Sequence, residues 1–389
     1  MKRSSDRILV THAGSLPRPD DLIAFNREQP GSDATEARLQ TAVAEVVERQ
    51  AALGVDVVND GEFGKPMTDA ADYGAWSTYI YQRLSGFERR EVSLKNALKE
   101  IMGDSKDRRD FAGYYGSAAI SRMAERDRPI ALAVNVAPIR YTGQALVQRD
   151  IANFKAALAN VRVSDAFMSA IVTGVQVAVS EHYGSKEQEA VAVAEAMREE
   201  YAAIVNAGFS LQLDDPLLVN VYEFQHSVTR DIAGFRNWAA RHVELVNHAL
   251  EGIPENRVRY HLCWGSWEGP HSADLPLHAV IDLLLRVKAS QYSFEAANPQ
   301  HEHEWKEWKN VKLPDGRALI PGVVTHKTTV LEHPEVVADR LVRYAKIVGK
   351  ENVVAGTDCG LGGRIHPELA WAKLKTLAEG AALASRRLW

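Results

Sequence analysis

Residues 258–265, Val-Arg-Tyr-His-Leu-Cys-Trp-Gly, are the most informative stretch of this chain of 389 residues. The stretch predicts a β-strand, and residues i and i+2 of a strand point to the same face of the sheet. The imidazole of His261 and the thiol of Cys263 should therefore project side by side. Such a pair is a typical beginning of a zinc site.

Two other predicted strands end in similar side chains. Residues 290–297 contain Glu295, and residues 352–359 end in Cys359, the second of only two cysteines. Each residue alone has a plainer interpretation, since a lone Cys is usually a small buried apolar residue and a lone strand-end Glu is usually a solvated rim residue. Together, however, the three runs place these residues at the same relative position. This favours a parallel barrel whose site lies at the carboxyl ends of the strands.

The remaining pattern is that of alternating strands and helices, which is typical of an α/β fold with a parallel sheet. Amphipathic stretches at 35–53, 186–207, 334–348 and 367–386 separate most of the strands. We therefore predict a single (β/α)₈ TIM barrel over residues 1–389. The eight predicted strands lie at 8–15, 55–62, 169–176, 209–216, 257–264, 290–297, 319–325 and 352–359.

A long insertion with a β excursion is expected after the second strand, over approximately residues 63–165. A ninth apolar run at 129–136 would break the barrel count, so we place it in this excursion outside the barrel. The connection over 63–128 is too long for an ordinary loop. Inserts of this kind cover a site or mediate assembly, which keeps a homo-oligomer open.

Composition excludes several classes of protein. Charged residues make up 25% and hydrophobic residues 46%, an ordinary globular balance. The formal net charge of -5 offers no basic field for nucleic acid, and no apolar run approaches the length of a membrane span. The first residues lack a signal peptide's apolar core. Two cysteines make no disulfide framework, so we expect a cytoplasmic protein with free thiols.

Several motifs resemble the catalytic barrel of cobalamin-independent methionine synthase and its relatives. They are Gly14-Ser15-Leu16-Pro17, Asn59-Asp60-Gly61-Glu62, Gln212-Leu213-Asp214-Asp215-Pro216, the His261-x-Cys263 pair, Glu295 and Asp358-Cys359-Gly360. The resemblance implies that His261, Cys263, Glu295 and Cys359 bind one Zn²⁺, the set that strand-end placement also indicates. It further implies that Ser15, Glu62 and Asp214 bind the amino and carboxylate ends of homocysteine.

The implied reaction is zinc-dependent transfer of a methyl or other small alkyl group to a thiol, as in methionine biosynthesis. Zinc deprotonates a bound thiol and holds its sulfur as a nucleophile. Homocysteine is the leading acceptor, and the donor is methyl-folate or another alkyl compound. His326 lies near the position of a catalytic histidine of the family, where it is either a general acid for the leaving group or a loop residue.

Some features depart from the synthases proper. The chain has one barrel rather than two, and residues 173–183 lack the Trp that stacks on folate there. Residues 265–271 and 297–305 look closer to a short-chain branch that includes epoxyalkane:coenzyme M transferase. The alternative function is therefore thiolate opening of an epoxide, with Arg18 or Arg140 as a partner for a sulfonate. A non-catalytic zinc- and thiol-binding barrel is the second alternative.

The run His301-Glu302-His303-Glu304 also invites a metal-binding interpretation. Its histidines are two residues apart, a spacing that suits a strand, yet the run follows a strand end in a polar loop. We therefore expect no second metal there.

Overall fold

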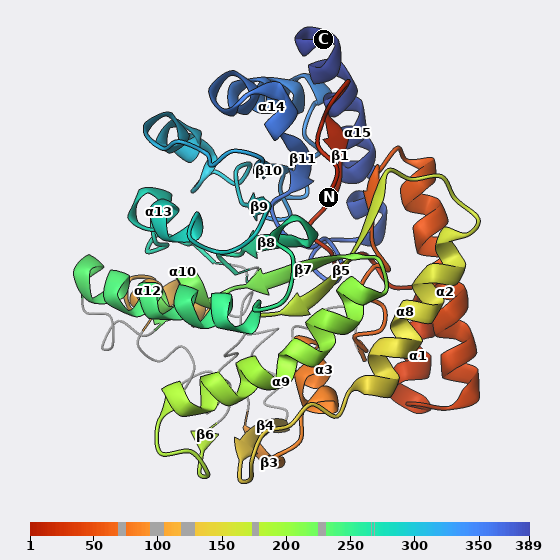
Figure 1. Cartoon of the computed structure of the whole chain (residues 1–389), viewed down its shortest axis with the longest axis vertical. Coiled ribbons are helices and arrows are strands. Elements are labelled where there is room, and N and C mark those ends of the chain that lie inside the picture. Colours follow the sequence, from red (N-terminus) through yellow and green to blue (C-terminus); the bar gives the residue numbers. More distant parts are fainter. Residues whose placement is uncertain are drawn as a thin grey trace.

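The central feature of the computed structural model is a sheet of eight parallel strands, surrounded by helices (Figure 1). The structure describes residues 1–68, 75–93, 105–117, 129–172, 179–224, 231–265, 267 and 269–389. The hydrogen-bonded order is β1-β11-β10-β9-β8-β7-β5-β2. The bounds are β1 Leu9–Val10, β2 Val57–Val58, β5 Asp165–Ile171, β7 Ser210–Asp215, β8 Val258–Leu262, β9 Gln291–Phe294, β10 Ala318–Val324 and β11 Val354–Thr357. The predicted TIM barrel is confirmed.

The barrel closes between β1 and β2 through single hydrogen bonds rather than a regular ladder. The Asp56 amide donates to the carbonyl of Val10 at 2.8 Å, and the Val10 amide donates to the Asp56 carboxylate at 2.9 Å. The Thr11 hydroxyl donates to the carbonyl of Val57 at 2.9 Å. We call this contact between the first two strands the seam.

The third barrel strand is shifted relative to its prediction, from 169–176 to Asp165–Ile171. The shift has a local cause, because the carbonyl of Asp56 accepts the amides of Ser164 and Asp165 at 2.8 and 3.2 Å. These bonds start the pairing with β2 several residues earlier than the apolar pattern indicates. Residues 173–178 lie outside the described residues, so the stretch without the stacking Trp falls largely among them.

The predicted amphipathic segments form outer helices. Caps fix where they begin: Ser32 accepts from the Thr35 amide at the start of α2, and Ser185 accepts from the Gln188 amide at the start of α9. The helices around the barrel are α1 Asp20–Glu28, α2 Asp33–Ala52, α8 Gln144–Leu158, α9 Lys186–Asn206, α10 Leu217–Phe224, α12 Ile232–Ala249, α13 Ile281–Leu284, α14 Pro334–Val348 and α15 Pro367–Leu388, with 3₁₀ segments Glu255–Arg257, Leu277–Ala279, Glu302–Asn310 and Lys350–Asn352.

The β excursion is a separate three-stranded sheet, at the bottom of Figure 1. In it, β4 (Pro129–Asn135) pairs antiparallel with β3 (Phe87–Ser93) and parallel with β6 (Val179–Ser180). The ninth apolar run, which forms β4, thus lies outside the barrel, as predicted. The third strand of this small sheet, β6, comes from the segment that follows β5 rather than from the insertion after the second barrel strand. The inserted stretch also contains α3 (Ala75–Arg83), α5 (Lys106–Asp110) and α6 (Ala112–Tyr115). Its last helix, α8, packs against α2 and α9 and so belongs to the barrel.

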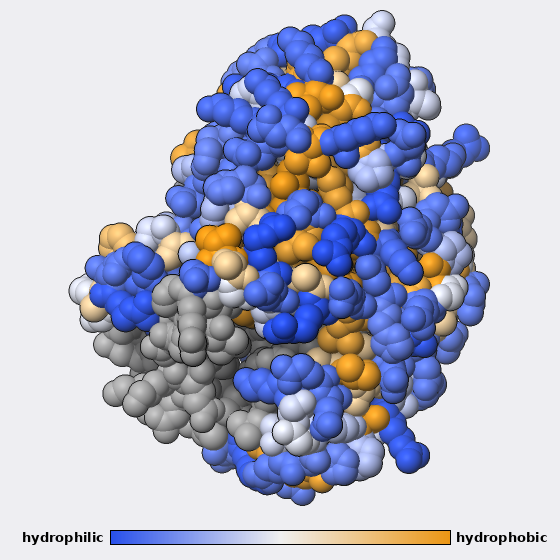
Figure 2. Space-filling model, turned by 60° about the vertical axis from the view of Figure 1, so that its left-hand side comes forward, coloured by the Kyte–Doolittle hydropathy of each residue, from blue (hydrophilic) through white to orange (hydrophobic). Residues whose placement is uncertain are grey.

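Apolar side chains from the strands and the inner helix faces form one large buried core. Hydrophilic residues cover most of the face shown in Figure 2, where apolar residues gather mainly in a band through the middle. Among the described residues, no helix combines the length and the apolar character needed to cross a membrane.

Candidate metal and thiol site

Three of the predicted zinc ligands meet at the carboxyl ends of the barrel strands. His261 lies on β8, Cys263 follows β8, and Cys359 follows β11. The two Sγ atoms are 3.6 Å apart, and one ligand atom from each of the three residues lies within 4.8 Å of the others. A group of this kind suits a zinc ion, which prefers thiolate and imidazole ligands.

The orientation of His261 is fixed by its neighbour on β9. Its Nδ1 lies 3.0 Å from the Ser293 hydroxyl, whereas its Nε2 is buried and makes no hydrogen bond. A buried nitrogen without a partner is costly. This nitrogen is therefore available for a metal, and the ligand set fits Zn²⁺. The bond of the other nitrogen to Ser293 is the kind of contact that orients metal-binding histidines.

The two thiols influence each other. Their contact lowers the pKa of Cys359 well below its usual range and raises the pKa of Cys263. The cause is that one sulfur can carry the charge while the other keeps its proton and donates to it. Cys359 is therefore the sulfur that ionises more easily, and Cys263 would release its proton when a cation binds.

Glu295, the predicted fourth ligand, lies buried beside this group without joining its close cluster. Its Oε1 accepts the Trp264 amide at 3.2 Å, and its Oε2 accepts the side-chain amide of Asn298. Burial raises its pKa to about 8, and the charge of Lys327 opposes that rise. Asp358 positions the loop, since its Oδ1 accepts the amides of Ala296 and Ala297 at 2.7 and 2.9 Å.

Two buried carboxylates form the predicted amino-group site. Asp214, on β7, accepts from Gln212 Nε2 at 2.7 Å with one oxygen, while its other oxygen has no hydrogen-bond partner. Burial and the charge of Glu62 raise the pKa of Asp214 to about 8. Glu62 follows β2 with φ of 62°. A Cβ on Gly14 would lie only 2.3 Å from Glu62 Oε1, so the β1 loop and this carboxylate are in close contact.

Ser15 lies beside the same loops. Its carbonyl accepts the amides of Leu361 and Gly362 at 2.8 and 3.0 Å, which joins the β1 loop to the loop that follows Cys359. Arg18 donates to the Ser15 hydroxyl at 3.3 Å and to the Glu62 carbonyl at 2.5 Å. Arg18 thus connects the β1 loop to the backbone at Glu62, whereas Arg140 is exposed.

His326 is buried, and neither of its ring nitrogens makes a hydrogen bond. Burial lowers its pKa to about 3, although the nearby Cys359 acts in the opposite direction. The side chain is therefore a neutral imidazole with two open positions. This environment is more consistent with a site residue than with a solvated loop histidine.

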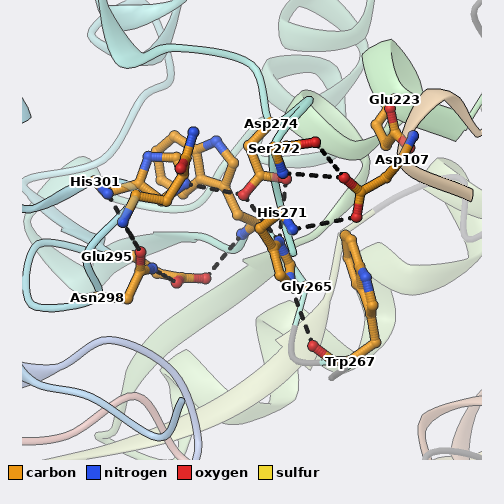
Figure 3. Close-up of polar contacts among 12 residues, drawn as sticks. Asp107, Glu223, Gly265, Trp267, His271, Ser272, Asp274, Glu295, Asn298 and His301 are labelled. Atoms are coloured by element: carbon orange, nitrogen blue, oxygen red, sulfur yellow. Dashed lines mark hydrogen bonds and ion pairs between the residues drawn. The ribbon is translucent and has the colours of Figure 1, made fainter. Parts of the chain in front are cut away.

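The run with His301 and His303 is divided between core and surface. His301 is buried and lies between Glu304, 2.8 Å from Nδ1, and Asp274, 3.1 Å from Nε2, whereas His303 is exposed. Figure 3 shows His301 in a network with Asp274 and His271 beside Glu295. In the described part of the chain, His301 and His303 do not belong to a potential metal-binding group.

Sequence comparison decides the family. Residues 90–382 match the family described as the cobalamin-independent synthase catalytic domain. The chain belongs to this family. Membership supports a methionine-synthase-like transferase and agrees with the resemblance carried by the motifs.

Proteins similar to this chain are named for different activities. A 2-hydroxypropyl-CoM lyase from Xanthobacter autotrophicus is 23% identical over 390 residues, covering 93% of this chain and 89% of the relative. A methionine synthase from Thermococcus kodakarensis is 23% identical over 384 residues, covering 96% and 93%. The B12-independent methionine synthase structure from Shewanella sp. W3-18-1 shares the fold, with a TM-score of 0.73 at 18% identity over 98% of this chain and 99% of that one.

Proposed function

We propose that this family member is a zinc-dependent S-alkyltransferase that transfers a methyl or other small alkyl group to a thiol, with homocysteine as the leading acceptor. The observation that carries the proposal is the buried Nε2 of His261, which has no hydrogen-bond partner and lies on a residue grouped with two thiols. His261, Cys263 and Cys359 would hold the zinc, with Glu295 as fourth ligand. When bound, Zn²⁺ lowers the pKa of a substrate thiol so that its sulfur can attack carbon.

The chain's own residues would bind and orient the thiol. The open oxygen of Asp214, together with the neighbouring Glu62, suits a substrate ammonium, because the charge of Glu62 disfavours the ionised form of Asp214 and a bound cation would offset that repulsion. Ser15 would bind the substrate carboxylate from the β1 loop. His326, neutral and open at both nitrogens, would handle the leaving-group proton.

The alternative acceptor is coenzyme M, which is supported by the relative named 2-hydroxypropyl-CoM lyase. Coenzyme M carries a sulfonate and no ammonium. The charge of Glu62 would repel a sulfonate at this position, whereas a substrate ammonium would favour the ionised form of Asp214, so the site favours an amino-acid thiol over coenzyme M.

The test begins with metal content. Protein loaded with zinc should bind one ion per chain, and Cys263→Ser should lose most of it; a Cys263→Ser protein with full zinc content contradicts the ligand assignment. The loaded protein is then incubated with homocysteine or coenzyme M against methyl-folate and short epoxides, and products are followed by mass spectrometry. Alkylated homocysteine supports the proposal. Turnover only of coenzyme M with an epoxide supports the alternative, and zinc binding without any turnover supports the non-catalytic barrel.

A further inference from the structure

The loop that follows Cys263 is held by a lysine from another loop. We call residues 263–274 the β8 loop, of which 263–265, 267 and 269–274 are described. Lys327, after β10, places its Nζ 2.9 Å from the Gly265 carbonyl, 3.3 Å from the Trp267 carbonyl and 2.9 Å from His271 Nε2. An ammonium has three protons and no acceptor. These three contacts therefore use its whole donor capacity on one loop.

Both ring nitrogens of His271 have polar partners. Nε2 lies 2.9 Å from Lys327 Nζ and 3.1 Å from the Trp267 carbonyl, and Nδ1 lies 2.9 and 3.1 Å from the two carboxylate oxygens of Asp274. The ring also stacks on Trp267, with centroids 4.1 Å apart (Figure 3). The lysine thus connects the β8 loop to the buried Asp274–His301 network.

The insertion also holds this loop. Asp107 at the start of α5 accepts the amides of His271 and Ser272 at 3.2 and 3.1 Å, and also the Ser272 hydroxyl. Asp107 is in turn fixed by Glu223, which accepts its amide at 2.9 Å (Figure 3). His271 has φ of 52°, a strained conformation for a residue other than glycine, and such strain persists only where the surroundings impose it.

Gly265 connects this arrangement to the metal site. Its amide donates to Cys263 Sγ at 3.3 Å, and its carbonyl accepts from Lys327. Lys327 is also the residue directly after His326. A single side chain therefore joins the backbone next to a proposed zinc ligand to the loop that carries the proposed proton-transfer residue.

We propose that Lys327 is a positioning residue that fixes Cys263 and His326 relative to each other, an inference that rests on the proposed function. It acts through the backbone of the β8 loop and through His271 rather than by contact with substrate. Outer contacts of this kind typically change metal affinity or activity by about 10- to 100-fold when they are removed.

The test compares Lys327→Met, which keeps length without donors, with Lys306→Met on an exposed lysine. In Lys327→Met we expect zinc affinity, measured by competition with a chromophoric chelator, and kcat to fall about 10- to 100-fold. The KM for the thiol should stay within about twofold, since the residues proposed to bind its amino-acid end (Ser15, Glu62 and Asp214) lie on or after other strands. Lys306→Met should match wild type in every measurement. Zinc affinity and kcat of Lys327→Met within twofold of wild type would overturn the inference.

Lys327→Arg separates positioning from charge. A guanidinium restores the charge but is a planar fork that cannot reproduce three contacts at one nitrogen. If the zinc affinity of Lys327→Arg stays below that of wild type, the result supports the positioning role. If Lys327→Arg binds zinc as tightly as wild type, charge alone is sufficient and the positioning role is overturned.

A further measurement on metal-free protein separates this inference from the proposed function. The rate at which a thiol reagent modifies Cys263, resolved from Cys359 by peptide mapping, should change several-fold in Lys327→Met because the Gly265 amide shifts. Equal rates in wild type and variant would overturn the positioning role even if wild type bound no zinc. Failure of wild type to take up zinc would instead count against the proposed function.

Discussion

Replacing Asp214 with Asn should remove a specific preference for thiols that carry an ammonium group. Asp214 is 8% exposed as a residue; one of its carboxylate oxygens accepts from Gln212 Nε2, and the other has no partner. An ammonium would therefore make one charge-assisted bond there, which contributes about 1.5–3 kcal/mol. At 1.4 kcal/mol per factor of ten, the dissociation constant of homocysteine should rise about 10- to 150-fold in Asp214→Asn.

The assay is calorimetric titration of zinc-loaded protein with homocysteine and with 4-mercaptobutyrate, which is homocysteine without its amino group. Wild type should prefer homocysteine, and Asp214→Asn should lose most of that preference while its affinity for 4-mercaptobutyrate stays equal or improves. Asp315→Asn, on an exposed carboxylate, serves as the matched control. An equal preference for homocysteine in wild type and Asp214→Asn would refute the assignment of this carboxylate to an ammonium.

Three further outcomes are expected. Arg83→Met should lower the free energy of unfolding by about 3–5 kcal/mol in a denaturant titration, because the buried Glu200, 3.1 Å from the guanidinium, would lose its one ion-pair partner among the described residues; a loss below about 1 kcal/mol contradicts this. Burial disfavours the charged form of His301, but its two carboxylate partners raise its pKa to about 10. Its contribution to stability is then fully present below pH 6.5 and lost as pH rises through about 10, so wild type and His301→Gln should converge in stability over that range; a constant difference would count against it. Gly14→Ala should cost about 1–3 kcal/mol of stability and weaken thiol binding, since φ is +124° and the new Cβ would displace the carboxylate of Glu62; unchanged binding and melting temperature would show that the loop adapts.

Much of the site was predictable because the rules involved are local. Two-residue periodicity along one strand placed His261 beside Cys263. The common direction of parallel strands brought Cys359 to the same end of the barrel. The ninth strand could be assigned to an excursion because a closed barrel has no position for it.

Other parts depend on packing between distant segments, and local patterns carry no information about them. Ser293 orients His261 only because β8 and β9 are neighbours in one particular register. The contact of Asp107 with the β8 loop joins residues more than 160 positions apart. The earlier start of the third strand likewise follows from the carbonyl of Asp56, which the apolar pattern of that strand does not record.

The seam between β1 and β2 is where the strands at the mouth of the barrel have the least backbone pairing. The proposed sulfur and imidazole ligands lie on or after strands that are paired on both sides, whereas Ser15 and Glu62 follow two-residue strands that meet across isolated bonds. Local opening takes the least free energy where backbone pairing is thinnest, so amide hydrogen exchange should be fastest around the seam. Under the proposed function, the amino-acid end of a bound thiol would therefore be released before its sulfur end.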